Sequence, residues 1–272
     1  MSVSTPAAAA HARRRPALTL VLHQFRYDLR AFLRNGQSRF FTLALPVLFL
    51  LIFCSVFGNG TVRVPGGTIK ESTYYVPGLV ALGIISASFV NLVISITAQR
   101  ESGILKRRRS TPVPAWVLIA GRALTAVVTA AAIAVLLVLI GWAGYGAHLP
   151  GRTIPAIVVA VVLGSVTFCV LGYALASVVG SEDSAQPIVQ AVMLPLYFIS
   201  GVFVPSDIIP RWLTRIADVF PVRHLSRALL TAFNPHTTGA GFAWHDMLIL
   251  GIWGVAGLVV AIRRFSWQPK ET

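Results

Sequence analysis

Long apolar stretches, each near the length needed to cross a lipid bilayer, occupy most of this chain of 272 residues. Hydrophobic residues make up 56% of the sequence and charged residues 12%, about half the charged fraction of an ordinary soluble domain. At roughly 20 residues per crossing, the apolar stretches leave space for six spans and none for a soluble catalytic domain. The sequence therefore predicts an all-α integral membrane protein with six transmembrane helices.

Charges, prolines and glycines between the apolar stretches set the predicted boundaries. A disordered basic tail is expected at residues 1–16 and a cytoplasmic tail at residues 263–272, with the membrane domain at residues 17–262 between them. The spans are predicted at residues 40–57, 75–98, 115–142, 153–179, 186–203 and 246–262. We expect Pro46 to kink the first span. Residues 58–72 are expected to form a polar outer loop.

Residues 17–36 have the period of an amphipathic helix rather than the composition of a span. At helical spacing, six apolar side chains fall within an arc of about 100°, and three arginines lie on the adjacent flank. The apolar set is Leu18, Leu22, Phe25, Leu29, Phe32 and Leu33, and the arginines are Arg26, Arg30 and Arg34. This pattern is typical of a helix that lies in the membrane interface with its arginines among the headgroups.

Residues 204–244 are too apolar for a free loop, although they carry four arginines. Prolines divide them into two predicted short helices, residues 211–220 and 222–233, with Ser206 or Asp207 as a cap and with Arg215 facing Asp218. Two short helices joined at a proline predict a re-entrant hairpin that dips into the outer leaflet. A hairpin lying flat on the surface is the alternative. The residues expected to shape it are Ser200, Gly201, Pro205, Pro210, Pro221 and Arg223.

The distribution of positive charge predicts that both termini are cytoplasmic. With the termini inside, only seven of the 23 Lys and Arg residues fall in outer loops. They are Arg63, Lys70, Arg152, Arg211, Arg215, Arg223 and Arg227. Because the charges flank spans, orientation explains the net charge of +14 better than nucleic-acid binding does, and the expected partner surface is membrane lipid.

A basic stretch at residues 99–112, called the coupling segment below, separates the second and third spans. Five basic residues lie between Arg100 and Arg109. Each arginine costs roughly 2.5–3.5 kcal/mol at the centre of a bilayer, so the stretch is expected to be a cytoplasmic loop. A turn is predicted at Glu101–Gly103 and a short helix at residues 104–110. Charge alone is equally consistent with a plain orientation anchor.

Three motifs resemble the ABC-2 type transporter permeases, in the subfamily that includes bacterial drug and antibiotic exporters. The first is R-E-x-G-x-L-x-x-x-x-x-T-P-V-P, from Arg100 to Pro114. The second is L-P-x-x-x-x-S-G-x-x-x-P, from Leu194 to Pro205, and the third is the run from Phe220 to Thr231. The resemblance covers nearly the whole chain. One departure is Lys106, where the family usually has an acidic residue.

The resemblance implies that the coupling segment forms a helix that docks onto a separate ATPase subunit. The residues implied in docking are Glu101, Ser102, Gly103, Leu105, Arg107, Arg108, Thr111 and Pro112. The chain has no G-x-x-x-x-G-K-[ST] loop to hold phosphates, so ATP and Mg²⁺ are expected on the partner and no catalytic or metal site on this chain. The resemblance also implies a bacterial cell membrane and a second copy or a paralogous permease around a central path.

The resemblance further implies that the spans at residues 75–98 and 186–203 line the central path. Polar and sulfur side chains at helical spacing support this, with hydrogen bonding between helices as the alternative. The candidates are Ser88, Asn91, Ser95, Gln190, Met193 and Tyr197. No charge is predicted at mid-span, which favours a hydrophobic or amphiphilic substrate such as a drug, antibiotic or lipid-like compound. The alternatives are a lipid-linked glycan or teichoic-acid-type polymer and, in another class, an ion-coupled secondary carrier.

Overall fold

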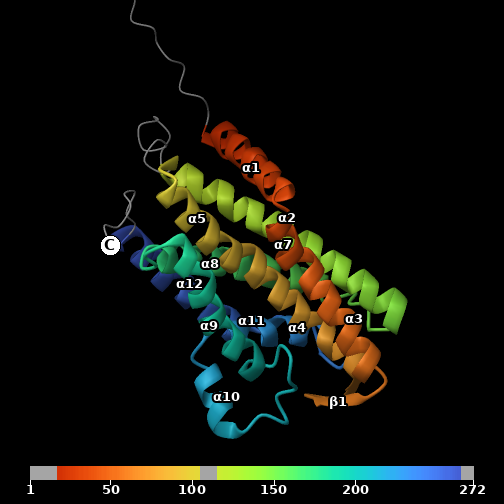
Figure 1. The fold of residues 1–272 in the computed structure, drawn as a ribbon. Helices are drawn as coiled ribbons and strands as arrows, with labels where there is room; N and C mark the ends of the chain where they lie inside the picture. The colour runs from red at the N-terminus through yellow and green to blue at the C-terminus, as the bar shows by residue number, and fades with distance from the viewer. Residues whose placement is uncertain (1–16, 105–114, 265–272) are drawn as a thin grey trace, which may run out of the picture.

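The structure is a computed structural model that describes residues 17–104 and 115–264. Over these residues it is a bundle of long helices with one small antiparallel sheet (Figure 1). The elements are α1 (Ala17–Arg34), α2 (Gly36–Arg39), the π-helical turn η1 (Phe40–Ala44), α3 (Leu45–Phe57), β1 (Thr61–Val64), β2 (Gly67–Lys70), α4 (Glu71–Ile85), the π-helical turn η2 (Ser86–Val90), α5 (Asn91–Glu101), α7 (Ala115–Tyr145), α8 (Ile154–Ala176), α9 (Glu182–Ile199), α10 (Arg211–Ala217), α11 (Pro221–Phe233) and α12 (Trp244–Arg264).

Five stretches of helix in the described chain are long and apolar enough to cross a membrane. They are Gly36–Phe57, Glu71–Glu101, Trp116–Tyr145, Ile154–Ala176 and Trp244–Arg263. The prediction of a helical, multi-pass membrane protein is confirmed at this level. The predicted fifth span corresponds to α9, which is not among the five, because its first two turns carry Glu182, Asp183 and Gln186, which lower its hydropathy.

The stretch from α4 through η2 to α5 is the centre of the bundle. In its most apolar window 78% of the residues are buried inside the protein, compared with 22% for Gly36–Phe57. Glycines let neighbouring elements approach it closely: a Cβ on Gly83 would lie 2.5 Å from Ile133 of α7, and one on Gly78 would lie 2.6 Å from the carbonyl oxygen of Val202. This helix therefore packs mainly against protein rather than lipid.

The first span is irregular close to Pro46, where the sequence predicts a kink. Pro46 lies in the first turn of α3, and the π-helical turn η1 precedes α3 directly. A proline and a π-helical turn are both common causes of a helix kink, and the kink itself stays a prediction.

The predicted polar loop at residues 58–72 contains a β-hairpin instead. Val64 pairs with Gly67 across a two-residue turn, Pro65-Gly66, in which Gly66 has a φ of 94°. The Asn234 side-chain amide donates to the Pro65 carbonyl oxygen at 2.9 Å, and His236 Nε2 donates to that of Thr68 at 3.1 Å. The hairpin thus docks on the segment that follows α11, which supplies partners that a flexible loop would lack.

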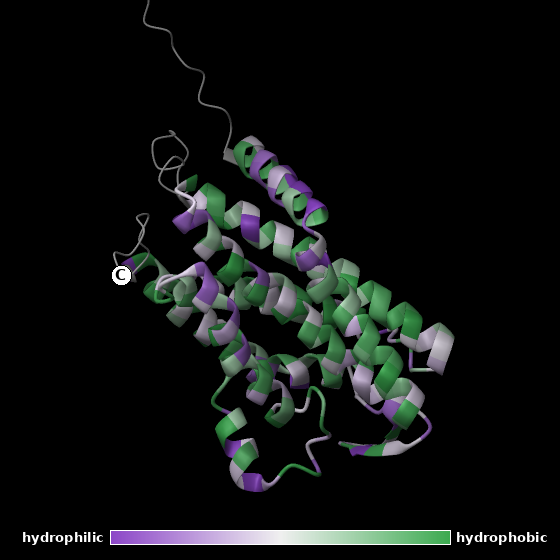
Figure 2. Cartoon of the chain, in the orientation of Figure 1, coloured by the Kyte–Doolittle hydropathy of each residue, from purple (hydrophilic) through white to green (hydrophobic). Residues whose placement is uncertain are grey.

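The two ends of the bundle differ in what they contain (Figure 1). The α1 end holds α1, the last turn of α5 and the start of α7, while the β-hairpin end holds the sheet and α10. Between the ends the helices are predominantly hydrophobic, and the hydrophilic residues gather toward α1 and toward the β-hairpin end (Figure 2). This pattern matches a membrane-embedded middle with polar surfaces at both ends.

Candidate transport pathway and coupling site

A cavity of about 500 Å³ lies between α1, α5, α7 and α9. Apolar side chains make up part of its wall, and amides and hydroxyls make up much of the rest. Among its polar lining residues are Tyr27, Asp28, Asn91, Ser95, Arg122, Gln186, Gln190 and Tyr197. We call this space the inner cavity. Its size and mixed lining match sites that take small organic ligands.

The inner cavity brings together Asn91, Ser95, Gln190 and Tyr197, four of the six residues predicted to line the path. Met193 is buried and does not line the cavity. Ser88 is also outside its lining: the side chain is fully buried, and its hydroxyl donates to the Ile84 carbonyl oxygen of its own helix. The turn η2 includes Ser88 and ends just before Asn91, and its i→i+5 bonding shifts the helical phase, so simple spacing misplaces Ser88.

Sequence reasoning missed an ion pair in the wall of the inner cavity. Arg122 Nε of α7 lies 3.6 Å from Asp28 Oδ2 of α1, and both side chains are mostly buried. Arg122 Nη1 also donates to Ser95 Oγ at 2.9 Å, and Gln99 Nε2 donates to the same oxygen at 3.0 Å. These contacts tie α1 and α7 to α5. The signal in the sequence was Asp28 itself, the single acid of α1.

The predicted turn after the second span is present. The helix α5 ends at Glu101, and Gly103 has a φ of 71°, a left-handed conformation that favours glycine. Ser102 donates through its hydroxyl to the Ala98 carbonyl oxygen at 2.8 Å. The remaining docking candidates, Leu105, Arg107, Arg108, Thr111 and Pro112, lie outside the described residues, as does most of the predicted short helix at residues 104–110.

Arg100 does not lie in a loop as predicted, because it belongs to the last turn of α5 and is only 2% exposed. Its guanidinium donates to the carbonyl oxygens of Ala176 at 2.9 Å, Val179 at 2.5 Å and Gly180 at 2.9 Å. These groups lie at and just beyond the C-terminus of α8, where carbonyls carry partial negative charge. The rule that a charged side chain avoids lipid still holds, since Arg100 is surrounded by protein.

Glu101 contacts the far end of the loop between α8 and α9. Its Oε1 accepts the backbone N–H of Glu182 at 2.8 Å, and Glu182 is the first residue of α9. The remaining N-terminal donors of α9 are partly satisfied by Ser181, whose hydroxyl accepts the Ser184 N–H at 3.2 Å. Consecutive residues of α5 therefore hold the end of α8 and the start of α9.

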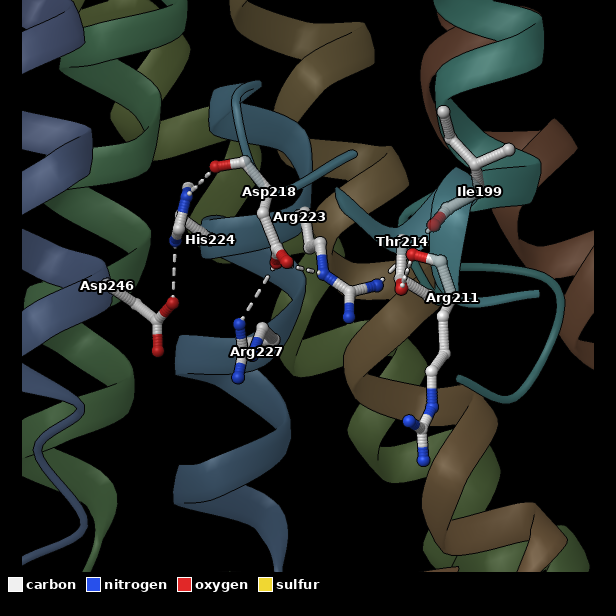
Figure 3. A network of polar contacts seen from close by, with 8 residues as sticks. All are labelled: Ile199, Arg211, Thr214, Asp218, Arg223, His224, Arg227 and Asp246. Atoms are coloured by element: carbon white, nitrogen blue, oxygen red, sulfur yellow. Dashed lines mark hydrogen bonds and ion pairs between the residues drawn. The ribbon is translucent and has the colours of Figure 1, made fainter. Parts of the chain in front are cut away.

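At the β-hairpin end, Asp218 is the centre of a polar network that joins four elements (Figure 3). Its carboxylate accepts from Arg223 Nε at 2.6 Å and from Arg227 Nη1 at 3.2 Å. Asp218, expected to be a helical neighbour of Arg215, is the C-cap residue of α10, and its carboxylate pairs with Arg223 and Arg227 of α11. Arg223 also reaches the Ile199 carbonyl oxygen at the end of α9, at 3.4 Å.

His224 carries the network onward to α12 (Figure 3). Its Nε2 donates to the Asp218 carbonyl oxygen at 2.8 Å, and its Nδ1 lies 2.6 Å from Asp246 Oδ1. Burial lowers the pKa of His224, but the bonds to Asp246 and to the Asp218 carbonyl raise it more, so the net shift is upward. Potential metal-ligand atoms of His224, His245 and Asp246 lie within 4.8 Å of one another. However, both ring nitrogens of His224 are already engaged, which favours an imidazolium–carboxylate pair.

The other residues predicted to shape this region are turn and cap positions. Gly201 ends the α9 turn with a φ of 81°, and its carbonyl oxygen accepts the Tyr74 hydroxyl at 2.9 Å. Ser200 and Pro205 are buried. Pro210 is the N-cap residue of α10, so the cap predicted at Ser206 or Asp207 is absent, and Pro221 is the first residue of α11. Residues 199–246 are therefore a braced structure that contains two short helices, as the prolines predicted.

Comparison with known proteins finds relatives over most of the described fold. Residues 19–234, from α1 to just after α11, match the family described as ABC-2 type transporter. The chain is 30% identical over 226 residues to the daunorubicin resistance ABC transporter permease protein DrrB1 of Streptomyces coeruleorubidus, covering 79% of this chain and 73% of that protein. It is 24% identical over 153 residues to the probable multidrug ABC transporter permease YbhR of Escherichia coli (strain K12), covering 56% of this chain and 41% of that protein.

Proposed function

Because the chain belongs to the ABC-2 type transporter family, we propose that it is the permease subunit of an ATP-driven exporter of hydrophobic or amphiphilic compounds. The observation that carries the proposal is the inner cavity of about 500 Å³, where amides and hydroxyls of α5 and α9 stand among apolar side chains. Such a lining suits a drug, an antibiotic or a lipid-like compound, which needs apolar contact and a few oriented hydrogen bonds.

In this proposal ATP hydrolysis takes place on a separate ATPase subunit that holds ATP and Mg²⁺ and docks on the coupling segment. The chain has no phosphate-binding loop of the G-x-x-x-x-G-K-[ST] type. A second copy of the chain, or a paralogous permease, completes the path. Apolar side chains of α9 that point away from the protein, including Val192, Leu194 and Phe198, offer a surface for that copy or for lipid.

The proposed topology places both termini in the cytoplasm and adds α9, as the fifth span in chain order, to the five long apolar helices. In it α1 lies in the membrane interface: it packs on α7 at Gly121, where a Cβ would lie 2.6 Å from Gln24, yet it leaves Leu18, Leu22 and Leu33 exposed. The segment from 204 to 244 would re-enter the outer leaflet. Its helix α11 has most of its residues buried, which is what re-entrant backbone requires.

The test is export into inside-out vesicles from cells that express the chain together with its ATPase subunit, with daunorubicin as the probe. We expect ATP-dependent accumulation that is lost when the phosphate-binding lysine of the ATPase is replaced. Gln190→Leu should reduce the rate, since it removes a cavity amide, whereas Val158→Leu on the exposed face of α8, away from the cavity, serves as the control. Accumulation that proceeds without the ATPase would contradict the proposal.

The alternative of an ion-coupled carrier gains one observation from the structure, because Asp28 supplies a mostly buried carboxylate to the inner cavity. A carrier of that class would work from a proton gradient alone and stop when an ionophore collapses it. The ion pair of Asp28 with Arg122, however, favours a structural role for this carboxylate. The glycan-polymer alternative predicts instead that no small probe moves and that deletion of the gene depletes a cell-surface polymer.

A further inference from the structure

Arg100 and Glu101, the last two residues of α5, hold both ends of the loop between α8 and α9. Arg100 donates to the Ala176, Val179 and Gly180 carbonyl oxygens, and Glu101 accepts from the Glu182 N–H. The charges are matched to the helix dipoles, with a cation at a C-terminus and a carboxylate at an N-terminus. The next residues along the chain form the turn that leads into the rest of the coupling segment.

We propose that Arg100 and Glu101 are positioning residues that make the α8–α9 loop follow the end of α5, so that movement of the coupling segment reaches the inner cavity through α9. The inference rests on the proposed function, since it assumes that an ATPase moves the coupling segment. It assigns to the two residues a role distinct from docking: they act inside the permease.

The hydrogen bonds of Arg100 give a physical reason why the end of α5 and the end of α8 would move together. Within the described chain no carboxylate forms an ion pair with Arg100, so its charge is satisfied by the carbonyl oxygens at the end of α8. Separating α5 from α8 would leave a guanidinium buried and unpaired, which is strongly unfavourable. The planar guanidinium donates to several acceptors in a fixed geometry, which a flexible ammonium does not reproduce.

The hydrogen bond of Glu101 joins the start of α9 to the ends of α5 and α8. Glu101 is exposed, so its contact with the Glu182 N–H contributes little to folding, but it fixes the position of the first turn of α9. Farther along α9, Gln186, Gln190 and Tyr197 line the inner cavity. A displacement of the α5 end would therefore reach the residues that would face the substrate along α9, which stays one continuous helix through Pro187 and Pro195.

The N–H of Glu182 can be removed with little disturbance of α9. Glu182 is the first helical residue, where proline is well tolerated, and Ser181 before it is already extended with φ −129° and ψ 161°. Glu182→Pro removes the donor to Glu101, while Glu182→Ala removes only the side chain and sets the reference. Glu101→Ala breaks the same bond from the other side, and Asp183→Asn is its control, an exposed acid in the same turn as Glu182.

The experiment uses the full permease, with Cys54 and Cys169 changed to alanine, reconstituted with its ATPase. A cysteine at Gln190 reports on the inner cavity through its rate of reaction with a membrane-impermeant maleimide, measured with and without ATP. We expect Glu182→Pro and Glu101→Ala to reduce the ATP-dependent change in labelling by about tenfold relative to their references, while ATP hydrolysis continues. Arg100→Lys, which keeps the charge, should retain part of the change, and Arg100→Gln should lose it.

The outcomes separate the inference from the function on which it rests. If the parent protein responds to ATP and Glu182→Pro and Glu101→Ala respond as their references do, the inference is wrong and the proposed function stands. If the parent protein itself shows no ATP-dependent labelling with an active ATPase, the proposed function is wrong and the inference falls with it. A parallel loss of hydrolysis and labelling in both variants would also overturn the inference, since it would place Glu101 in docking.

Discussion

The two ends of the bundle are held together in different ways. At the β-hairpin end one residue, Asp218, accepts bonds from Arg223, Arg227 and His224, and further bonds join this centre to α9 and α12. At the α1 end the elements surround a cavity and are joined by two separate sets of bonds, those around Arg122 and those of Arg100 and Glu101, instead of through one residue. The β-hairpin end is braced by one network, whereas the α1 end surrounds a cavity and its bonds meet at α5.

This difference indicates where movement can occur without unfolding. A cavity wall lacks the packing contacts that resist displacement, while a polar network with every member satisfied fixes one arrangement. In an exporter driven from the cytoplasm, the α1 end would change shape and the β-hairpin end would keep its form. The predictions below test that contrast through stability, and the last one tests it through transport.

The largest expected effect comes from filling a close contact near the braced end. In Gly78→Ala the new Cβ would lie 2.6 Å from the Val202 carbonyl oxygen, and backbone cannot move aside as a side chain can. We expect a loss of roughly 3 kcal/mol in the free energy of unfolding, measured by thermal unfolding in detergent. Gly180→Ala is the matched change at the α1 end, where nothing lies within 4 Å, and should change stability by less than about 0.5 kcal/mol. Equal losses would contradict the contrast.

The next effect concerns the network itself. Asp218→Asn removes the charge that pairs with Arg223 and Arg227, and since Asp218 is 43% exposed in its side chain, solvent screens part of the loss. We expect a destabilisation of about 1.5 kcal/mol. Asp207→Asn, an exposed acid in the same region, should cost less than about 0.5 kcal/mol. If the two variants unfold at the same temperature, the network does not brace this end.

The His224–Asp246 pair should make stability depend on pH. The folded protein raises the pKa of His224 above its ordinary value of 6.5, so the pair contributes fully below that value and its contribution is lost as pH rises through the folded pKa. Asp246→Asn should therefore destabilise the protein most under mildly acidic conditions, by on the order of 1 kcal/mol, and should flatten the profile. Thermal unfolding across pH 5 to about 9 checks this, and a constant difference between the two proteins would refute it.

The spans could be predicted from sequence because lipid and a protein core both select apolar side chains. For the same reason sequence could not show that Glu71–Glu101 is the buried centre of the bundle. The β-hairpin was accessible in principle, since Pro65-Gly66 is a turn signal and follows the alternating Val62 and Val64. The turn η2 was not, because it depends on a local change of hydrogen bonding that leaves no clear pattern in the residues.

The site was predictable where helical spacing alone decided it. Gln190 and Tyr197 share a face of α9, and both line the inner cavity, whereas Met193 on the same face is buried outside its lining. Arg100 was misplaced because the cost of charge in lipid says nothing about a charge held by protein carbonyls. Asp28 was overlooked because a helical wheel shows which residues share a face, but not that this part of α1 would lie against α7.

Asp28→Asn should have the smallest effect on stability and a disproportionate effect on transport. The carboxylate approaches Arg122 at 3.6 Å without a hydrogen bond, asparagine keeps an oxygen at the same place, and Arg122 retains its bond to Ser95, so we expect a destabilisation of only about 0.5 kcal/mol. The substitution nevertheless removes a charge from the cavity wall and loosens α1 from α7, which Arg122 joins to α5. ATP-driven export of the probe should fall severalfold at unchanged thermal stability. If export and stability instead fall together, the pair is a brace like Asp218, and the two ends of the molecule do not differ in kind.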